Sequence, residues 1–135
     1  MTSRAEAPTE SSMRIGEAAA ASGVTVKGIR HYEAEGMLPG IRRVGSYREL
    51  SDSDVERLKL IAHCRRLGFS LPEIGEILHL VSTSKPECPP PEAMDAIVEG
   101  KIRESRRAIA RLEQRAAKLH ETRRYLAERM AARRA

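Results

Sequence analysis

The longest regular pattern in the chain lies in its last third, from Ile102 to Met130. Apolar or small residues recur there in alternating steps of three and four, over about four heptads. This spacing predicts one long helix, and a helix of roughly 35 residues extends about 50 Å. The seam residues that we expect are Ile102, Ile109, Leu112, Ala116, Leu119 and Leu126. A stripe this narrow cannot enclose a core, so we expect a two-helix coiled coil between identical chains. The alternative is that the helix packs on the N-terminal part of its own chain.

Aromatic residues are scarce in the sequence, and charged residues are abundant. The 135 residues include three Tyr, one Phe and no Trp, while charged residues make up 32%. A large independent core is therefore not expected, which again favours a partner chain. The net charge of +5 favours an anionic partner such as nucleic acid.

The N-terminal part of the sequence predicts short helices separated by clear stop signals. The segment IGEAAAASG ends at Gly23, a residue type that commonly ends helices. Thr25 follows as the expected N-cap of a helix from Val26 to Glu35. Two helices joined by so short a turn predict a helix-turn-helix.

The segment after Pro39 lacks a helical period and predicts a short basic hairpin, or wing. Its expected strands are 41–44 and 47–50, with a turn at Gly45 and Ser46. The SDSD segment then predicts the cap of a helix from Val55 to Leu67, and Ser70 the start of another. This is a second pair of helices with a short turn.

The polar tips of the second helix, Val26 to Glu35, point to DNA. In a helix-turn-helix, that helix enters the major groove and its first residues reach bases and phosphates. We expect Lys27 and Arg30 to contact guanine or phosphate, and Thr25, His31 and Tyr32 to contact phosphate or sugar. The wing adds further expected phosphate contacts through Arg42, Arg43, Tyr47 and Arg48. The second helix pair adds Arg66 and, less specifically, Arg57, Lys59 and His63.

Three stretches of the sequence resemble the MerR family of bacterial transcription regulators. They are MRIGEAAAASGVTVKGIRHYEAEGMLP, SYREL and LKLIAHCRRLGFSLPEIGEIL, which together lie between Met13 and Leu80. The most specific pattern runs from Ile29 to Pro39, and Ser46 stands where the wing of the family usually has Gly.

The resemblance implies a mainly α fold: a winged helix-turn-helix DNA-binding domain followed by a long dimerisation helix that forms an antiparallel coiled coil. It also implies a homodimer on double-stranded promoter DNA, at a pseudo-palindromic site. Such regulators distort the spacer DNA in response to an effector, so that bacterial RNA polymerase engages both promoter elements. DNA deformation of this kind costs several kcal/mol.

The two cysteines, Cys64 and Cys88, leave the effector open. Part of the resemblance, through IAHCRRLGFSLPEI, is to the family branch that senses soft heavy metals such as lead and cadmium. Cys88 is a candidate ligand for a soft metal ion (Pb, Cd, Hg, Zn or Cu), with Cys64 a weaker one. The further cysteines that this branch carries after the dimerisation helix have no counterpart here. Cys64 also fits a buried apolar position or a reactive thiol sensor.

The organisation that we expect has four parts. Residues 1–12 form a disordered tail, 13–81 the winged helix-turn-helix domain, 82–92 a Pro-rich linker and 93–135 the dimerisation helix.

No signal peptide or membrane-spanning run is recognisable, so we expect a cytoplasmic, nucleoid-associated protein without a membrane partner. No motif of an enzyme is present, and the main alternative is a non-specific architectural DNA-binding or coiled-coil interaction protein.

Overall fold

Two short helices and the turn between them open the fold. The computed structural model describes residues 11–85 and 91–134; most of the expected tail, part of the expected linker and Cys88 lie outside the described residues. Helix α1 (Ile15–Ser22) ends at Gly23, whose φ of 76° is the left-handed conformation that glycine adopts without strain. Helix α2 (Val26–Ala34) begins after Thr25, whose Oγ1 accepts a hydrogen bond from the Gly28 backbone N–H at 3.0 Å. The expected helix-turn-helix is confirmed.

A small antiparallel sheet follows the second helix. Strands β2 (Arg42–Val44) and β3 (Tyr47–Leu50) form the expected wing, and Gly45 supplies a positive φ of 62° in its turn. The sheet also holds β1 (Met13–Arg14), which pairs with the other side of β3. We did not expect β1, because two residues are too few to show strand alternation.

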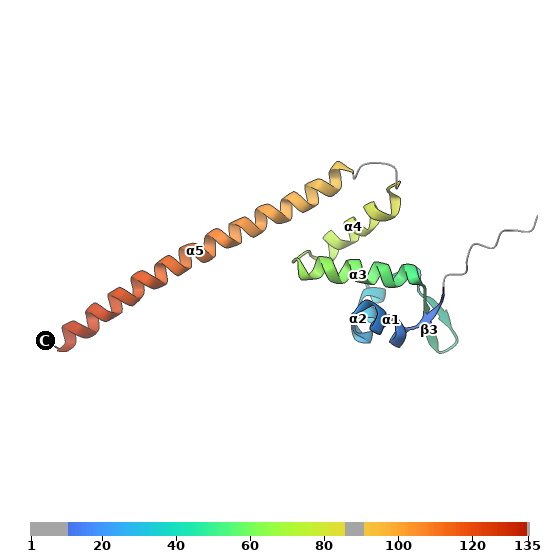
Figure 1. Cartoon of the computed structure of the whole chain (residues 1–135), viewed down its shortest axis with the longest axis horizontal. Helices are drawn as coiled ribbons and strands as arrows, with labels where there is room; N and C mark the ends of the chain where they lie inside the picture. Colours follow the sequence, from blue (N-terminus) through green and yellow to red (C-terminus); the bar gives the residue numbers. More distant parts are fainter. Residues whose placement is uncertain (1–10, 86–90, 135) are drawn as a thin grey trace, which may run out of the picture. The chain divides into compact units, whose positions relative to one another are not determined.

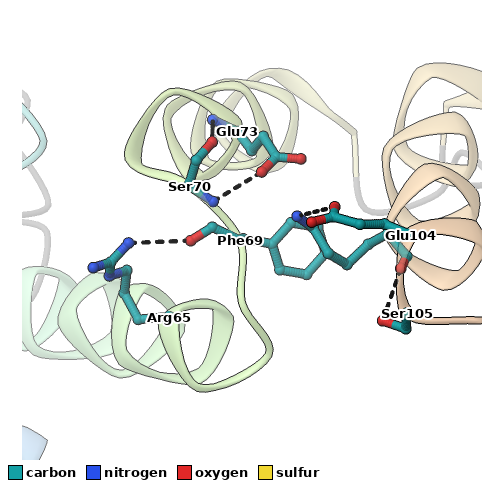
Figure 2. Close-up of polar contacts among 7 residues, drawn as sticks. Arg65, Phe69, Ser70, Glu73, Glu104 and Ser105 are labelled. Carbon is teal, nitrogen blue, oxygen red and sulfur yellow. Dashed lines mark hydrogen bonds and ion pairs between the residues drawn. The ribbon is translucent and has the colours of Figure 1, made fainter. Parts of the chain in front are cut away.

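Helices α3 (Asp52–Arg66) and α4 (Leu71–Thr83) complete the N-terminal unit. Helix α3 begins one turn earlier than expected, because Ser51 and Asp54 cap each other's backbone N–H groups around its first turn. The same arrangement of Ser70 and Glu73 begins α4 (Figure 2). Helix α4 continues to Thr83, two residues into the segment that we expected to be a linker.

The core of this unit lies where α3 packs against α1 and β3 on one side and α4 on the other (Figure 1). Its largest fully buried side chains are Ile29, Leu50, Leu58, Ile61 and Ile74. They come from α2, β3, α3 and α4, so the core joins the helix-turn-helix, the wing and the second helix pair into one packed body. Ile74, Ile77 and Leu78 are all buried, so one apolar face of α4 belongs to this core.

Helix α5 (Glu92–Arg134) forms the second unit of the chain, which divides near residue 86. Its 43 residues give a length of about 65 Å. No residue of α5 is buried, so the apolar stripe predicted from the heptads is open to solvent. None of the helices in the described residues is long and apolar enough to cross a membrane.

Candidate nucleic-acid interface

Helix α2 separates its buried and exposed residues cleanly. Ile29 is fully buried, and Tyr32 and Glu33, three and four positions later on the same side, are half-buried. Lys27, Arg30 and His31 have the same spacing on another side of the helix, and all three are exposed.

The consequence is one cationic, hydrogen-bonding face on the second helix of the helix-turn-helix. Thr25 is exposed at its first turn, where it already accepts the capping bond from Gly28. Tyr32 is the one predicted contact residue on α2 that belongs partly to the interior. Its ring lies 5.7 Å from that of His31, centroid to centroid.

The wing presents a second exposed basic surface. Arg42, Arg43 and Tyr47 are exposed, as a role in phosphate binding requires. The guanidinium carbon of Arg14 lies 4.1 Å from the centroid of the Tyr47 ring, a cation–π contact. Arg14 thus adds a cation beside the wing that sequence reasoning missed, because only the pairing of β1 with β3 brings it there.

An ion pair joins the wing to α2. Arg48 Nε donates to Glu33 Oε2 at 2.8 Å, and the two side chains are only 20% and 27% exposed. We expected Arg48 to contact the DNA backbone, and its half-buried contact with Glu33 gives it a structural role as well. The spacing of Glu33 from buried Ile29 was the one signal in the sequence that it lies on the inner side of α2.

The cations of the second helix pair are not equivalent. Arg57 Nε donates to the backbone oxygen of Met37 at 2.6 Å, so this side chain fastens the loop after α2. Lys59 pairs with Glu56 on its own helix, and an Nη of Arg65 donates to the backbone oxygen of Phe69 (Figure 2). Arg66 and His63 are exposed on α3, so exposure permits the contact predicted for Arg66.

The described residues do not assemble a metal site. No group of three or more His, Cys, Asp or Glu side chains within 11–85 and 91–134 is placed to hold an ion. Cys64 is 4% exposed in the core, and burial raises the pKa of its thiol above the ordinary value. A buried, protonated thiol fits the prediction that Cys64 occupies an apolar position in the core. It argues against a role of Cys64 as a metal ligand or a reactive thiol sensor. Cys88 lies outside the described residues.

The predicted seam residues of α5 are exposed along its whole length. Ile109, Leu112, Leu119 and Leu126 are 52% to 62% exposed, and Ile102 is 39% exposed. Ala116 is exposed as well. Within α5 itself, the whole stripe is therefore uncovered.

Comparison with known proteins matches two regions of the chain. A profile described as "MerR HTH family regulatory protein" matches residues 13–80, and another described as "MerR, DNA binding" matches 55–129. A probable heavy metal-dependent transcriptional regulator of Haemophilus influenzae is 43% identical over 56% of this chain and 60% of its own length. The regulator ZntR of Escherichia coli K12 is 39% identical over 74% of this chain and 70% of its own.

A solved structure is similar over most of its length. The transcription regulator PbrR691 from Ralstonia metallidurans CH34, in complex with lead(II), has a TM-score of 0.72 and 33% identity, covering 83% of this chain and 85% of that one. The matching segments span 60% of the length of the first curated relative, which is less than two thirds, and 70% of the second. Two family profiles that together match the helix-turn-helix, the second helix pair and most of α5 establish that the chain belongs to the MerR family of helix-turn-helix regulatory proteins.

Proposed function

We propose that the chain is a homodimeric transcriptional regulator that binds promoter DNA through α2 and the wing. The observation that carries the proposal is the exposed cationic face of α2, formed by Lys27, Arg30 and His31, in the second helix of a helix-turn-helix. Major-groove recognition by a second helix is the ordinary use of this arrangement. The profile described as DNA-binding, over residues 55–129, supports it.

The roles that we propose follow from position. Lys27 and Arg30 reach base edges or phosphates, while Thr25, His31 and Tyr32 bind phosphate or sugar. Phosphate contacts on the flanks come from the wing and from the end of α3, through Arg42, Arg43, Tyr47, Arg48 and Arg66. Promoter binding places the protein in the bacterial cytoplasm, at the nucleoid. The chain acts by binding and by distorting spacer DNA, with RNA polymerase as an indirect partner, and not by catalysis.

Dimerisation through α5 is the second part of the proposal. A row of exposed Leu and Ile side chains on a 43-residue helix favours pairing with another copy, since single helices with such a seam bury it in a coiled coil. Two recognition helices held at one separation match a pseudo-palindromic site.

The charges on α5 favour antiparallel pairing. A parallel, in-register pair places Arg123 against the same residue of the partner within the seam. It also sets Lys101 beside the partner's Arg106, and Arg129 beside the partner's Arg134. Like charges at these positions are destabilising, and the antiparallel arrangement separates them.

Selection from random DNA tests the DNA-binding role. The full chain is used to select duplexes from a random pool, and its affinity for the selected duplex is compared with that for a scrambled duplex at 50, 100 and 200 mM salt. We expect a specificity ratio of about 10³ or more. Equal affinity for both duplexes at every salt concentration would instead support the non-specific architectural protein.

A soft metal ion is a candidate for the effector of this regulator. It is favoured by the similarity to a lead-bound regulator and to relatives described as heavy metal-dependent. The described residues do not provide the ligand set, so the candidate depends on Cys88. The full chain is titrated with Pb(II), Cd(II), Hg(II) and Cu(I), and the thiolate-to-metal absorbance is recorded. Binding of Zn(II) is measured by its competition with these ions. An absorbance band that the Cys88→Ser variant lacks supports metal sensing, and the absence of any cysteine-dependent band refutes it.

A further inference from the structure

We propose that two copies of α5 pair in one antiparallel register, in which Ile109 of each copy faces the partner's Leu112. This inference rests on the dimer proposed above and specifies which residues of the second copy complete the seam. Both side chains are more than half exposed in the single chain, at 54% and 57%. At the centre of the pair, two such layers related by the dyad bury four large apolar side chains.

The layers on either side match in size. Ser105 faces the partner's Ala116, and Ile102 faces the partner's Leu119, so small residues meet small ones and large residues meet large ones. The hydroxyl of Ser105 already donates to the backbone oxygen of Lys101 at 2.9 Å (Figure 2). Because this bond lies within its own helix, Ser105 can be buried in the seam without losing a hydrogen-bond partner.

The residues that flank the seam are complementary in the same register. In antiparallel coiled coils, a heptad position just outside the seam faces the same heptad position of the partner helix. Here Arg106 lies beside the partner's Glu113, and Glu99 beside the partner's His120. All four side chains are exposed in the single chain and thus available for these pairs. The dyad repeats each pair, so the register gains four favourable contacts.

Sliding one helix by one heptad, so that the centre of the pair moves towards the C-terminal ends of both helices, removes this match. Glu113 then faces the partner's Glu113, and Arg115 faces the partner's Arg115. Lys101 also meets the partner's Arg129, so like charges line both flanks. The apolar layers remain acceptable in this register, and it is the flanking charges that disfavour it.

The remaining nearby registers are excluded by similar arguments. A shift of one heptad in the opposite direction sets Arg106 against the partner's Arg106 and Glu99 against the partner's Glu113. A shift of two heptads towards the C-terminal ends places the guanidinium of Arg123 against the partner's Leu112 near the centre of the pair, whereas the proposed register sets Arg123 against the partner's Val98 near its ends. Both charge and packing therefore favour the register centred between Ile109 and Leu112.

Disulfide trapping tests this register in the full chain. The background is Cys88→Ser, with Cys64 kept because it is buried. Ser105→Cys with Ala116→Cys places two thiols opposite each other only in the proposed register. Within one chain they lie about 16 Å apart along the helix, too far for a disulfide. The matched control, Ser105→Cys with Arg123→Cys, places its thiols opposite each other only after the one-heptad shift.

We expect mild oxidation to give a covalent dimer with the first pair of substitutions and none with the control or the background. A covalent dimer in the control alone, or in neither variant while gel filtration still shows a dimer, would overturn the register and leave the dimer standing. Gel filtration that shows a wild-type monomer would overturn the proposed dimer itself, so the two failures are distinguishable.

Charge exchange gives a second readout that needs no cysteine. We expect Arg106→Glu alone and Glu113→Arg alone each to weaken the dimer by about fivefold or more, since each creates two like-charge pairs. The double variant restores the pairs with their signs exchanged and is expected to recover the wild-type dissociation constant. Additive weakening in the double variant would overturn the pairing of these two residues.

Discussion

The ion pair between Glu33 and Arg48 offers a sharp test of how the wing and α2 act together. Glu33→Gln keeps the shape of the side chain and removes its charge. At 2.8 Å and an effective dielectric constant of 20, the direct attraction is about 6 kcal/mol, most of which is offset by desolvation. Because both side chains are less than a third exposed, we expect a net loss of about 1–2 kcal/mol in the free energy of unfolding.

The assay combines stability with DNA affinity. Urea unfolding should show the loss of about 1–2 kcal/mol. Affinity for the selected duplex should fall by at most about 5- to 30-fold, the factor that this free energy can supply if the wing is released from α2. Glu35→Gln is the matched control, because it removes the same charge from an exposed position next to α2 and should leave stability nearly unchanged.

The direction of the change in DNA affinity decides between two roles for Arg48. Removing a negative charge near phosphates raises affinity if nothing else changes. If Arg48 acts by holding the wing on α2, Glu33→Gln must weaken specific binding despite this gain. Affinity that rises by as much as in Glu35→Gln would refute the positioning role and leave Arg48 as a simple phosphate contact.

Three further predictions concern packing, recognition and assembly. Gly40→Ala places a Cβ 2.5 Å from Oδ1 of buried Asp54, so we expect a loss of about 1–3 kcal/mol in urea unfolding; unchanged stability would contradict this close approach. Arg30→Ala should weaken binding to the selected duplex by about 1–3 kcal/mol and lower the specificity ratio in a titration; an equal loss on scrambled DNA would assign it to phosphate alone. Leu112→Glu combined with Leu119→Glu should give monomers in gel filtration, and a persisting dimer would show that the seam lies elsewhere.

Much of the N-terminal unit could be predicted because its signals are local. Thr25 and Ser70 cap the helices that they were expected to cap, and Gly23 ends α1 in the left-handed conformation. Each of these signals depends on backbone groups within a few positions, so the sequence alone contains the relevant information.

The missed features depend on residues that are distant in the sequence. Strand β1 exists because Met13 pairs with Leu50, and Arg57 binds the backbone oxygen of Met37, 20 positions earlier. Nothing in the local pattern distinguishes Arg57 from an exposed cation such as Arg66. Long-range pairing of this kind follows only from the packed fold.

The start of α3 was missed for a different reason. The SDSD segment contains two serines that could cap a helix, and we placed the first helical residue at Val55. Ser51 is the cap, and Asp54 returns the hydrogen bond to the Ser51 backbone N–H at 2.8 Å. Ser53 and Glu56 have the same spacing as Ser51 and Asp54, so the pattern fits either serine, and only the structure identifies Ser51 as the cap.

Footprinting of the full chain on the selected duplex tests the central claim most directly, that a dimer reads DNA with two copies of α2. Hydroxyl-radical cleavage is measured at a salt concentration where scrambled DNA stays unprotected. We expect two protected half-sites related by a dyad, with centres separated by whole turns of the double helix. A single protected patch, or the lack of any salt concentration at which the selected duplex is protected and scrambled DNA is not, would contradict this claim.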